Sequence, residues 1–400
     1  MSQTEFDKMI DEWVERENKD RGKITIPKLG PYPVDSSGYY GQQMNEWVTT
    51  DSIRHYAVSL GDRNPLWWNE DYAKKTRWDG IIAPPTITDF IGMPSSTWRE
   101  SSAAAKSQFA RIVGGCNREW FQVIRPGDRF KCVDKWLGLE ERPVKQEPRR
   151  FRLFIDTHQR SYINQKDETV AVVDNRFMVM ANYPQPSPGG ERPSGAGARK
   201  RHRFTDEERD AIYRGYDEQT RRGADKLFWE DVVVGEELKP LVVGPLSSWD
   251  TAAFLAATPG QSVAFDIQWE RVKRDLRPEL LDPEINAWKP GEEGHLRDNS
   301  GHANRIAGGY AFGYGAQIEG LICRIICNWM GDDGFLKRLD CQFRVPSIHG
   351  DALWMKGKVT NKSSEGGEHL VDLEVHCENQ DGLMLVPGKA TVRLLSRTQS

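Results

Sequence analysis

The stretch TTDSIRHYAVSLGD (residues 49–62) is the most informative part of the sequence, because an altered copy of it, SWDTAAFLAATPGQ (residues 248–261), stands in the other half of the chain. Asp51 aligns with Asp250, and Gly61 aligns with Gly260. Both copies predict a helix that ends in a glycine turn. Self-similarity of this kind indicates a repeated structural unit.

Three more pairs of segments extend the repeat outward from this stretch. They are WDGIIAPPTI (78–87) with NRIAGGYAFG (304–313), WFQVIRPGDRFKCVDK (120–135) with FRVPSIHGDALWMKGK (343–358), and INQKDETVAVVDNRFMVM (163–180) with CENQDGLMLVPGKATVRL (377–394). In the last two pairs a turn leads into a β-rich run. Because the strands cluster after the helix and do not alternate with helices, each half predicts α+β organisation.

The segment YPQPSPGGERPSGAGARK (residues 183–200) separates the two halves, since its Pro, Gly and Ser content is typical of a linker. A helix is expected after it, with Thr205 as N-cap and Glu208 in the capping-box position. The domains are therefore predicted at residues 1–183, at 184–226 for the linker and its helix, and at 227–400 with an insertion at 262–294. An extra N-terminal helix is expected to bury one apolar face, formed by Phe6, Met9, Ile10 and Trp13.

Composition narrows the class of protein. The formal net charge is -4 and 28% of the residues are charged, which gives no overall attraction to nucleic acid. No stretch approaches the length of a membrane span, and the N-terminal sequence lacks the apolar region of a signal peptide. The six cysteines form no CxxC pair, which is typical of a reducing compartment. We therefore predict a cytoplasmic protein, and we expect no metal site because no His, Cys and carboxylate set has ligand spacing.

The stretch YAVSLGDRNPLWWNEDYAKKTRWDGIIAPP (residues 56–85) resembles the signature of the MaoC-like dehydratase and R-specific enoyl-CoA hydratase family. That signature reads Y-A, then G-D-x-N-P-x-H-x-D, an Ala four residues on, and later I-A-H-G. The segment that begins with IAGGYAFGYG (residues 306–315) is similar to the part that follows the signature in the same family. The resemblance implies a double hotdog fold, two tandem repeats that are each a long helix wrapped by an antiparallel sheet.

The same resemblance implies a hydro-lyase that adds water to, or removes it from, an acyl-CoA thioester. It implies no cofactor beyond the coenzyme A of the substrate, and a homo-oligomer, most simply a dimer. Such a reaction needs a base for water, an acid for the α-carbon and donors for the thioester oxygen.

In the first half, the resemblance places Asp62 and Asn64 at the Asp and Asn of the signature. Trp67 stands where the family has its histidine. Trp67 and Trp68 are then predicted to line the pocket, which favours a bulky or aromatic acyl group. Pro84 and Pro85 replace the H-G of I-A-H-G, and proline has no N–H to donate.

In the second half, Gln261 stands at the position of Asp62, and HLRDNSGHANRIAGG (residues 295–309) fits the later part of the signature. His295 then matches the histidine and His302 competes with it. The amides of Gly308 and Gly309 are expected to hold the thioester oxygen, and Tyr310 to donate a hydrogen bond beside them. Arg274, in a group of cations within the insertion, is expected to hold CoA phosphates or to lie on a solvated face.

Under this hypothesis, His295 is the general acid or base, and Asp62 with Asn64 positions water or substrate. Asp62 as a turn residue and His295 as a solvated loop residue are the plain alternatives. Two other functions stay open: a non-catalytic subunit that binds acyl-CoA or a partner hydratase, and a hotdog thioesterase that uses Asp62. His349 and the basic stretch ARKRHR (residues 198–203) are expected to face solvent.

Overall fold

The computed structural model describes residues 3–29, 42–43, 45–92, 109–144, 151–183, 199–258, 281–282, 287–288, 298 and 307–398. The helices in this part of the chain are α1 (Gln3–Asn18), α2 (Thr50–Ser59), α3 (Pro65–Trp68), α4 (Glu70–Ala73), η1 (Pro85–Ile87), α5 (Thr88–Ile91), α7 (Asp206–Asp217), η2 (Trp229–Asp231), α8 (Ser248–Ala257) and α12 (Gly315–Met330). The strands are β1 (Ile24–Thr25), β2 (Lys28–Leu29), β3 (Gln42–Gln43), β4 (Phe109–Trp120), β5 (Lys131–Arg142), β6 (Phe151–Ile163), β7 (Thr169–Asn182), β8 (Leu241–Val243), β9 (Leu281–Asp282), β10 (Ala287–Trp288), β11 (Phe335–Gln342), β12 (Leu353–Glu365), β13 (Glu368–Asn379) and β14 (Met384–Leu394).

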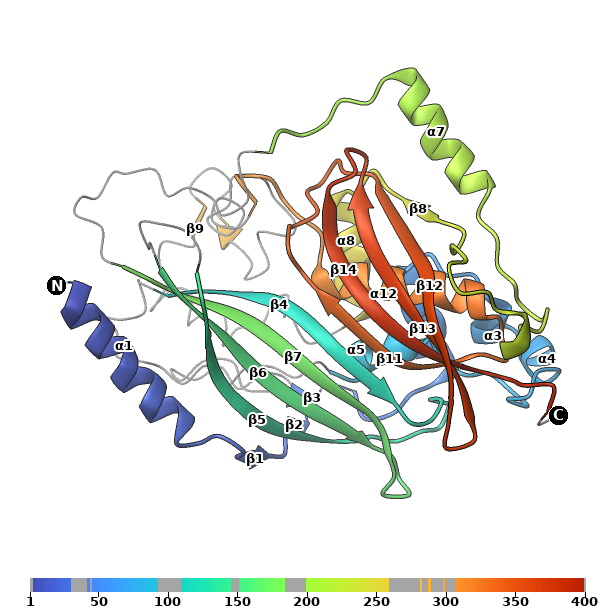
Figure 1. Ribbon diagram of the computed structural model, residues 1–400, viewed down its shortest axis with the longest axis horizontal. Helices are drawn as coiled ribbons and strands as arrows, with labels where there is room; N and C mark the ends of the chain where they lie inside the picture. The colour runs from blue at the N-terminus through green and yellow to red at the C-terminus, as the bar shows by residue number, and fades with distance from the viewer. Residues whose placement is uncertain are drawn as a thin grey trace.

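One antiparallel sheet of 10 strands runs through both halves of the chain (Figure 1). Its order is β1-β5-β6-β7-β4-β11-β14-β13-β12-β8, so the first five strands come from the first half and the last five from the second. The halves meet where β4 pairs with β11, with Cys116 opposite Cys341. This pairing is called the seam below, and it makes the two predicted repeats one continuous sheet.

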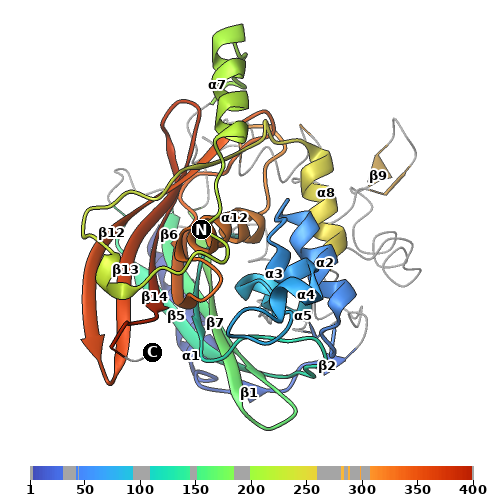
Figure 2. The same cartoon turned by 90° about the vertical axis from the view of Figure 1, so that its right-hand side faces the viewer.

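Helix α12 is the long helix that the second half wraps. Its side chains are buried on almost every side, because strands β11–β14 cover one flank and the helices α2–α5 lie on the other (Figure 2). A Cβ at Gly320 of α12 would come 2.7 Å from Leu60, so the missing side chain allows the end of α2 to approach the helix closely. The α+β organisation predicted from the sequence is confirmed.

The first-half segment that aligns with α12 lies mostly outside the described residues. The segment aligned with the start of α12 forms η1 and α5, and residues 93–108 follow it. The domain boundaries at 183 and 226 stay predictions.

The two copies of the opening stretch form matching helices that pack on each other. Helix α2 is capped by Thr49 and helix α8 by Ser247, each through a capping box. The rings of Tyr56 and Phe254 lie 6.2 Å apart between them. The predicted capping box of Thr205 and Glu208 is also present at the start of α7.

The N-terminal helix α1 buries the predicted apolar face. Phe6, Ile10 and Trp13 pack against the first-half strands through a cluster that includes Phe154 and Val179. These contacts add a second, smaller core at the far end of the sheet from the second half (Figure 1).

The basic stretch at residues 198–203 faces solvent only in part: Lys200, Arg201 and Arg203 are exposed as expected, whereas Arg199 and His202 are half-buried. Both carboxylate oxygens of Asp351 accept hydrogen bonds from Nη2 of Arg199 at 2.8 Å. His202 contacts Glu208 at 3.0 Å, and Arg201 donates through Nε to the carbonyl oxygen of His349 at 2.7 Å. The expectation therefore holds for the exposed residues and fails for the two half-buried ones: Arg199 meets a carboxylate of the second half 152 positions away, and His202 meets Glu208 six positions away.

A buried ion network joins the two halves behind the seam. Arg118 of β4 donates through Nε and Nη2 to the two carboxylate oxygens of Glu319 on α12, at 2.9 and 2.8 Å. Its Nη1 lies 2.8 Å from a carboxylate oxygen of Asp89 on α5 and also donates to Thr88. Arg118 and Glu319 are fully buried. Two carboxylates therefore share one guanidinium inside the core.

This arrangement gives a pH-dependent stability. Burial raises the pKa of Asp89 to about 6, against the opposing effect of Arg118. The folded protein thus holds the Asp89 proton more tightly than the unfolded chain, and this contribution is present below about pH 4 and lost as pH rises through about 6. We expect the unfolding free energy of the wild type, relative to Asp89→Asn, to fall by about 3 kcal/mol across that range.

Urea unfolding of both proteins at a series of pH values measures this difference. Asp51→Asn is the control. It removes an exposed carboxylate from α2 and so shows how the loss of one negative charge alone changes the unfolding free energy with pH. A wild-type minus variant difference that stays constant with pH would show that Asp89 keeps its ordinary affinity for protons.

Candidate active site

The signature loop of the first half is a chain of local caps. Helix α2 ends at Ser59, and Gly61 turns the chain with a φ of +61°. The side chain of Asn64 accepts a hydrogen bond from the backbone N–H of Leu66 at 3.1 Å and begins α3, with Pro65 in its first turn. Asn69, at the second Asp position of the family, caps α4 through the N–H of Tyr72. The loop residues therefore first serve to shape the loop itself.

The carboxylate of Asp62 is enclosed by donors from its own loop. Oδ1 accepts from the backbone N–H of Asn64 at 2.9 Å, and Oδ2 accepts from Nε1 of Trp67 at 2.9 Å. The carbonyl oxygen of Asp62 accepts from Nε1 of Trp68 at 3.0 Å, and the residue is 5% exposed. An indole donates but cannot accept or pass on a proton. Trp67 stands where the family signature has a histidine. Because its indole contacts the Asp62 carboxylate directly, no room is left between the two side chains for the water that an aspartate and a histidine would share.

Asp332 of the second half reaches into this loop from the turn after α12. Its Oδ1 accepts from Nδ2 of Asn64 at 3.3 Å, and its Oδ2 accepts from the hydroxyl of Tyr72. The indole of Trp78 donates to the Asp332 carbonyl oxygen at 2.6 Å. Burial, followed by the hydrogen bond to Asp332, raises the pKa of Tyr72 to about 12. Tyr72 thus stays protonated at neutral pH and acts here as a donor.

The cavity beside Asn64 and Trp67 is too small for a thioester. Its volume is about 30 Å³, and its wall includes Ile82, Ala83 and Asp332. A space of that size holds about one water. The backbone N–H of Ala83 donates to the carbonyl oxygen of Ile124 at 2.8 Å, and Pro84 and Pro85 have no N–H. Residues 83–85 therefore offer no amide to an oxyanion.

The corresponding segment of the second half keeps its glycines. Gly308 and Gly309 have φ values of +64° and +98°, which glycine adopts without strain. Two residues after Gly309, the backbone N–H of Ala311 donates to Oδ1 of Asp298 at 2.8 Å. Arg201 donates to the same oxygen at 2.9 Å and lies over the ring of Tyr310 at 4.8 Å. An acidic residue is thus fixed next to the glycine turn.

His349 lies at the same corner and was missed as a candidate. Its side chain is buried and does not face solvent as expected. The backbone N–H of His349 donates to the Ala311 carbonyl oxygen at 2.7 Å, and the imidazole Nε2 lies 3.2 Å from the hydroxyl of Thr251. Burial lowers its pKa, and the nearby Asp298 acts in the opposite direction. The imidazole is therefore neutral at pH 7. The signal for it was the difference between the repeats, because His349 aligns with Pro126.

The structure brings some of the predicted site residues together and is silent on others. Asp62, Asn64 and Trp67 meet at the small first-half cavity, and Trp68 contacts the same loop. Gly308, Gly309 and Tyr310 lie in the glycine turn of the second half. Gln261, Arg274, His295 and His302 lie outside the described residues. Asp332 and Asp298 were not predicted.

Two features are absent from the described residues. No helix among them is long and apolar enough to cross a membrane. No group of three or more His, Cys, Asp and Glu side chains among them is placed to hold a metal ion.

Part of the chain is similar in sequence to known proteins. A family model described as "FAS1-like, dehydratase domain region" matches residues 37–173. A curated protein of Thermobifida fusca (strain YX), named UPF0336 protein, is 32% identical over 88 residues, which are 21% of this chain and 57% of that protein. The chain thus aligns with little more than half of that relative.

Two solved structures are similar over almost the whole chain. A MaoC-like dehydratase is 16% identical with a TM-score of 0.52, and the match covers 90% of this chain and 100% of that one. A conserved hypothetical protein from Mycobacterium tuberculosis, described as having a double hotdog fold, is 14% identical with a TM-score of 0.51, covering 91% and 98%. The resemblance seen in the sequence is confirmed: residues 37–173 match a dehydratase domain region, and the chain as a whole has the double hotdog fold of MaoC-like proteins.

Proposed function

We propose that the protein is a hydratase or dehydratase of acyl-CoA thioesters and that its reacting groups belong to the second half. The observation that carries the proposal is the bond between Asp298 and the amide of Ala311. It fixes an acidic loop residue beside Gly308 and Gly309, the segment whose amides would hold a thioester oxygen. The first half offers no such arrangement, since Asp62 is enclosed and Pro84 and Pro85 lack N–H groups.

His295 is the group we propose as acid or base. It precedes Asp298 by three residues, so the covalent chain keeps their Cα atoms within about 11 Å of each other. In the hydration direction, the base removes a proton from water as the oxygen bonds to the β-carbon. A proton is then delivered to the α-carbon, and the negative charge that develops on the thioester oxygen is held by backbone amides. His302 remains the competing histidine.

The other predicted residues take supporting roles in this proposal. Asp62 and Asn64 hold the first-half loop, which Asp332 connects to the second half. Trp67 and Trp68 supply apolar surface, which favours a bulky acyl group. Gln261 and Arg274 are proposed to contact the substrate and its CoA phosphates. A cytoplasmic location and a homodimer also remain proposals.

The test is incubation of the purified protein with 2-enoyl-CoA and 3-hydroxyacyl-CoA thioesters, including aromatic and branched ones, followed by mass spectrometry for gain or loss of one water. We expect His295→Ala to lower the rate about 100-fold, which is typical for loss of a general acid or base. His302→Ala separates the two candidates from the same segment, because only the variant of the reacting histidine should show this loss. Asp62→Asn should retain most of the activity if that carboxylate only shapes its loop.

Other outcomes would replace the proposal. If Asp62→Asn and His295→Ala both abolish turnover, the two halves form one composite site. If thioesters bind without any change of mass, the protein is a non-catalytic acyl-CoA-binding or hydratase-partner subunit, which the closed first-half site favours as the second candidate. Release of free coenzyme A would identify a thioesterase.

A further inference from the structure

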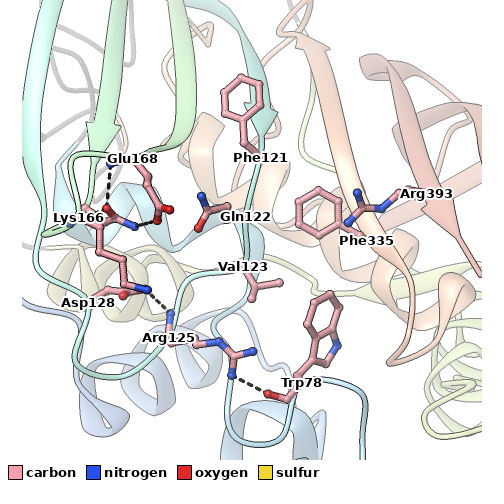
Figure 3. Close-up of a pocket in the computed structure, with 11 residues that line it drawn as sticks. Trp78, Phe121, Gln122, Val123, Arg125, Asp128, Lys166, Glu168, Phe335 and Arg393 are labelled. Carbon is pink, nitrogen blue, oxygen red and sulfur yellow. Dashed lines mark hydrogen bonds between the residues drawn. The ribbon is translucent and has the colours of Figure 1, made fainter. Parts of the chain in front are cut away.

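A surface cleft of about 330 Å³ lies at the seam and has no part in the proposed reaction. It receives Trp78, Phe121, Arg125 and Lys166 from the first half, and Phe335 and Arg393 from the second. Figure 3 shows Lys166 and Glu168 on one side of Gln122, and Phe335 and Arg393 on the other. The cleft shares Gln122, Val123 and Phe335 with the small cavity under Trp67, so it lies directly outside the closed first-half site.

Aromatic rings form much of the wall. Phe121 is 47% exposed, so about half of its side-chain surface is open to solvent. Phe335 and Trp78 each lie beneath a guanidinium, that of Arg393 at 4.7 Å and that of Arg77 at 4.1 Å. Phe335 is 6% exposed, so the open ring surface of the cleft comes from Phe121 and the half-buried Trp78. Such surface suits a planar ligand group, because stacking tolerates many ring systems.

The cations of the cleft have more hydrogen-bonding capacity than their protein partners use. Arg125 donates through Nη1 to the carbonyl oxygen of Trp78 at 2.7 Å, and Arg393 donates to Glu368 at 2.7 Å. A guanidinium has five donors, so several remain on each. Within the described residues, the ammonium of Lys166 has no ion pair. Burial and then the nearby Arg393 lower the pKa of Arg77, so these two cations repel each other.

The two carboxylates of the cleft are already occupied by donors of the loops. Asp128 accepts from the backbone N–H of Arg125 at 2.8 Å and from Gln165 at 3.4 Å. Glu168 accepts from Nδ2 of Asn164 at 2.9 Å, and this bond is the main cause of its lowered pKa. The acids therefore hold the turns in shape, while the cations keep donors for a ligand.

The geometry points to a binding site for a nucleotide. Its planar base would stack on Phe121 beside Trp78, and its phosphates would contact Lys166, Arg125 or Arg393. This chemistry has two sources, a free nucleotide or the nucleotide end of coenzyme A. The second source rests on the proposed function, whereas nucleotide binding itself does not.

Titration with adenosine 3′,5′-bisphosphate, followed by calorimetry, tests the site without any turnover. We expect Phe121→Ala to weaken binding about tenfold through lost stacking, and Lys166→Gln to weaken the bisphosphate more than adenosine. Both side chains are exposed, so both variants should fold. The matched control is Lys135→Gln, beside Trp136 in a separate surface cavity of about 380 Å³. Equal affinity in all four proteins, or inorganic phosphate binding as tightly as the bisphosphate, would overturn the site.

Kinetics separate the two sources. If the cleft holds the nucleotide end of the substrate, Phe121→Ala raises KM for an enoyl-CoA and leaves KM unchanged for the matching pantetheine thioester, which lacks the nucleotide. If the ligand is a free nucleotide, both KM values stay unchanged while Phe121→Ala still loses bisphosphate binding. Absence of turnover in the wild type would contradict the proposed function and leave the calorimetric result standing.

Discussion

Replacing Glu319 with alanine should lower the free energy of unfolding by about 3–5 kcal/mol, the cost typical of removing one partner from a buried ion pair. The variant leaves two donors of Arg118, Nε and Nη2, without their acceptors in the core. Asp89 remains beside Nη1 and becomes the remaining carboxylate of the network. The loss should appear in the denaturant midpoint, measured by tryptophan fluorescence.

Glu119, the residue after Arg118 on β4, supplies a matched control. It pairs with Arg338 across the seam, but both side chains of that pair are exposed. Glu119→Ala should therefore cost less than about 1 kcal/mol. If Glu319→Ala costs no more than Glu119→Ala, the buried network does not hold the two halves together. Glu319→Gln, which keeps the shape and one acceptor, should fall between the two.

A second large loss is expected from Gly115→Ala. Gly115 lies in β4 opposite Gln342 with a φ of +153°, and a Cβ there would come 2.3 Å from the carbonyl oxygen of Cys341. Both atoms are held by the seam, so one strand must move and break pairs on either side. We expect a loss of about 3–5 kcal/mol, the sum of a core overlap and an unfavourable backbone conformation.

Gly127→Ala isolates the backbone contribution. Gly127 has a φ of +90°, and a Cβ there would meet nothing within 4 Å. This control should cost about 1–2 kcal/mol. Thermal unfolding of the wild type and both variants measures the difference. A similar loss in the two variants would mean that the seam absorbs a methyl group and that its close approach is not required.

Local features of the fold could be predicted from the sequence because their partners are a few residues apart. Thr205 and Glu208 cap α7 across a single turn. The two copies of the opening stretch gave α2 and α8 because helix start and stop signals lie within them. The apolar face of α1 follows from helical spacing alone.

The contacts that define the site span the chain and could not be found in this way. Asp332 meets Asn64 across 268 positions, and Arg118 meets Glu319 across 201. A Gly-Asp-Asp-Gly turn after a helix indicates a helix end, but nothing in it names a partner in the other half. The burial of His349 has the same cause, since Thr251 and Ala311 come from separate elements. The motif places Asp62 in the loop after α2, but it does not reveal that the indole of Trp67 donates to the Asp62 carboxylate.

One continuous sheet runs through β4 and β11, so both repeats belong to one polypeptide, and a substitution in one repeat is not repeated in the other. In a symmetric pair of identical subunits, every substitution appears twice, so a tryptophan that closes one pocket closes both. Here the equivalent strands belong to one polypeptide, and Trp67 affects a single pocket. Covalent joining therefore lets one repeat give up its reactive geometry while the other is free to keep or change its own. Dilution also cannot separate the two repeats, because they share a backbone.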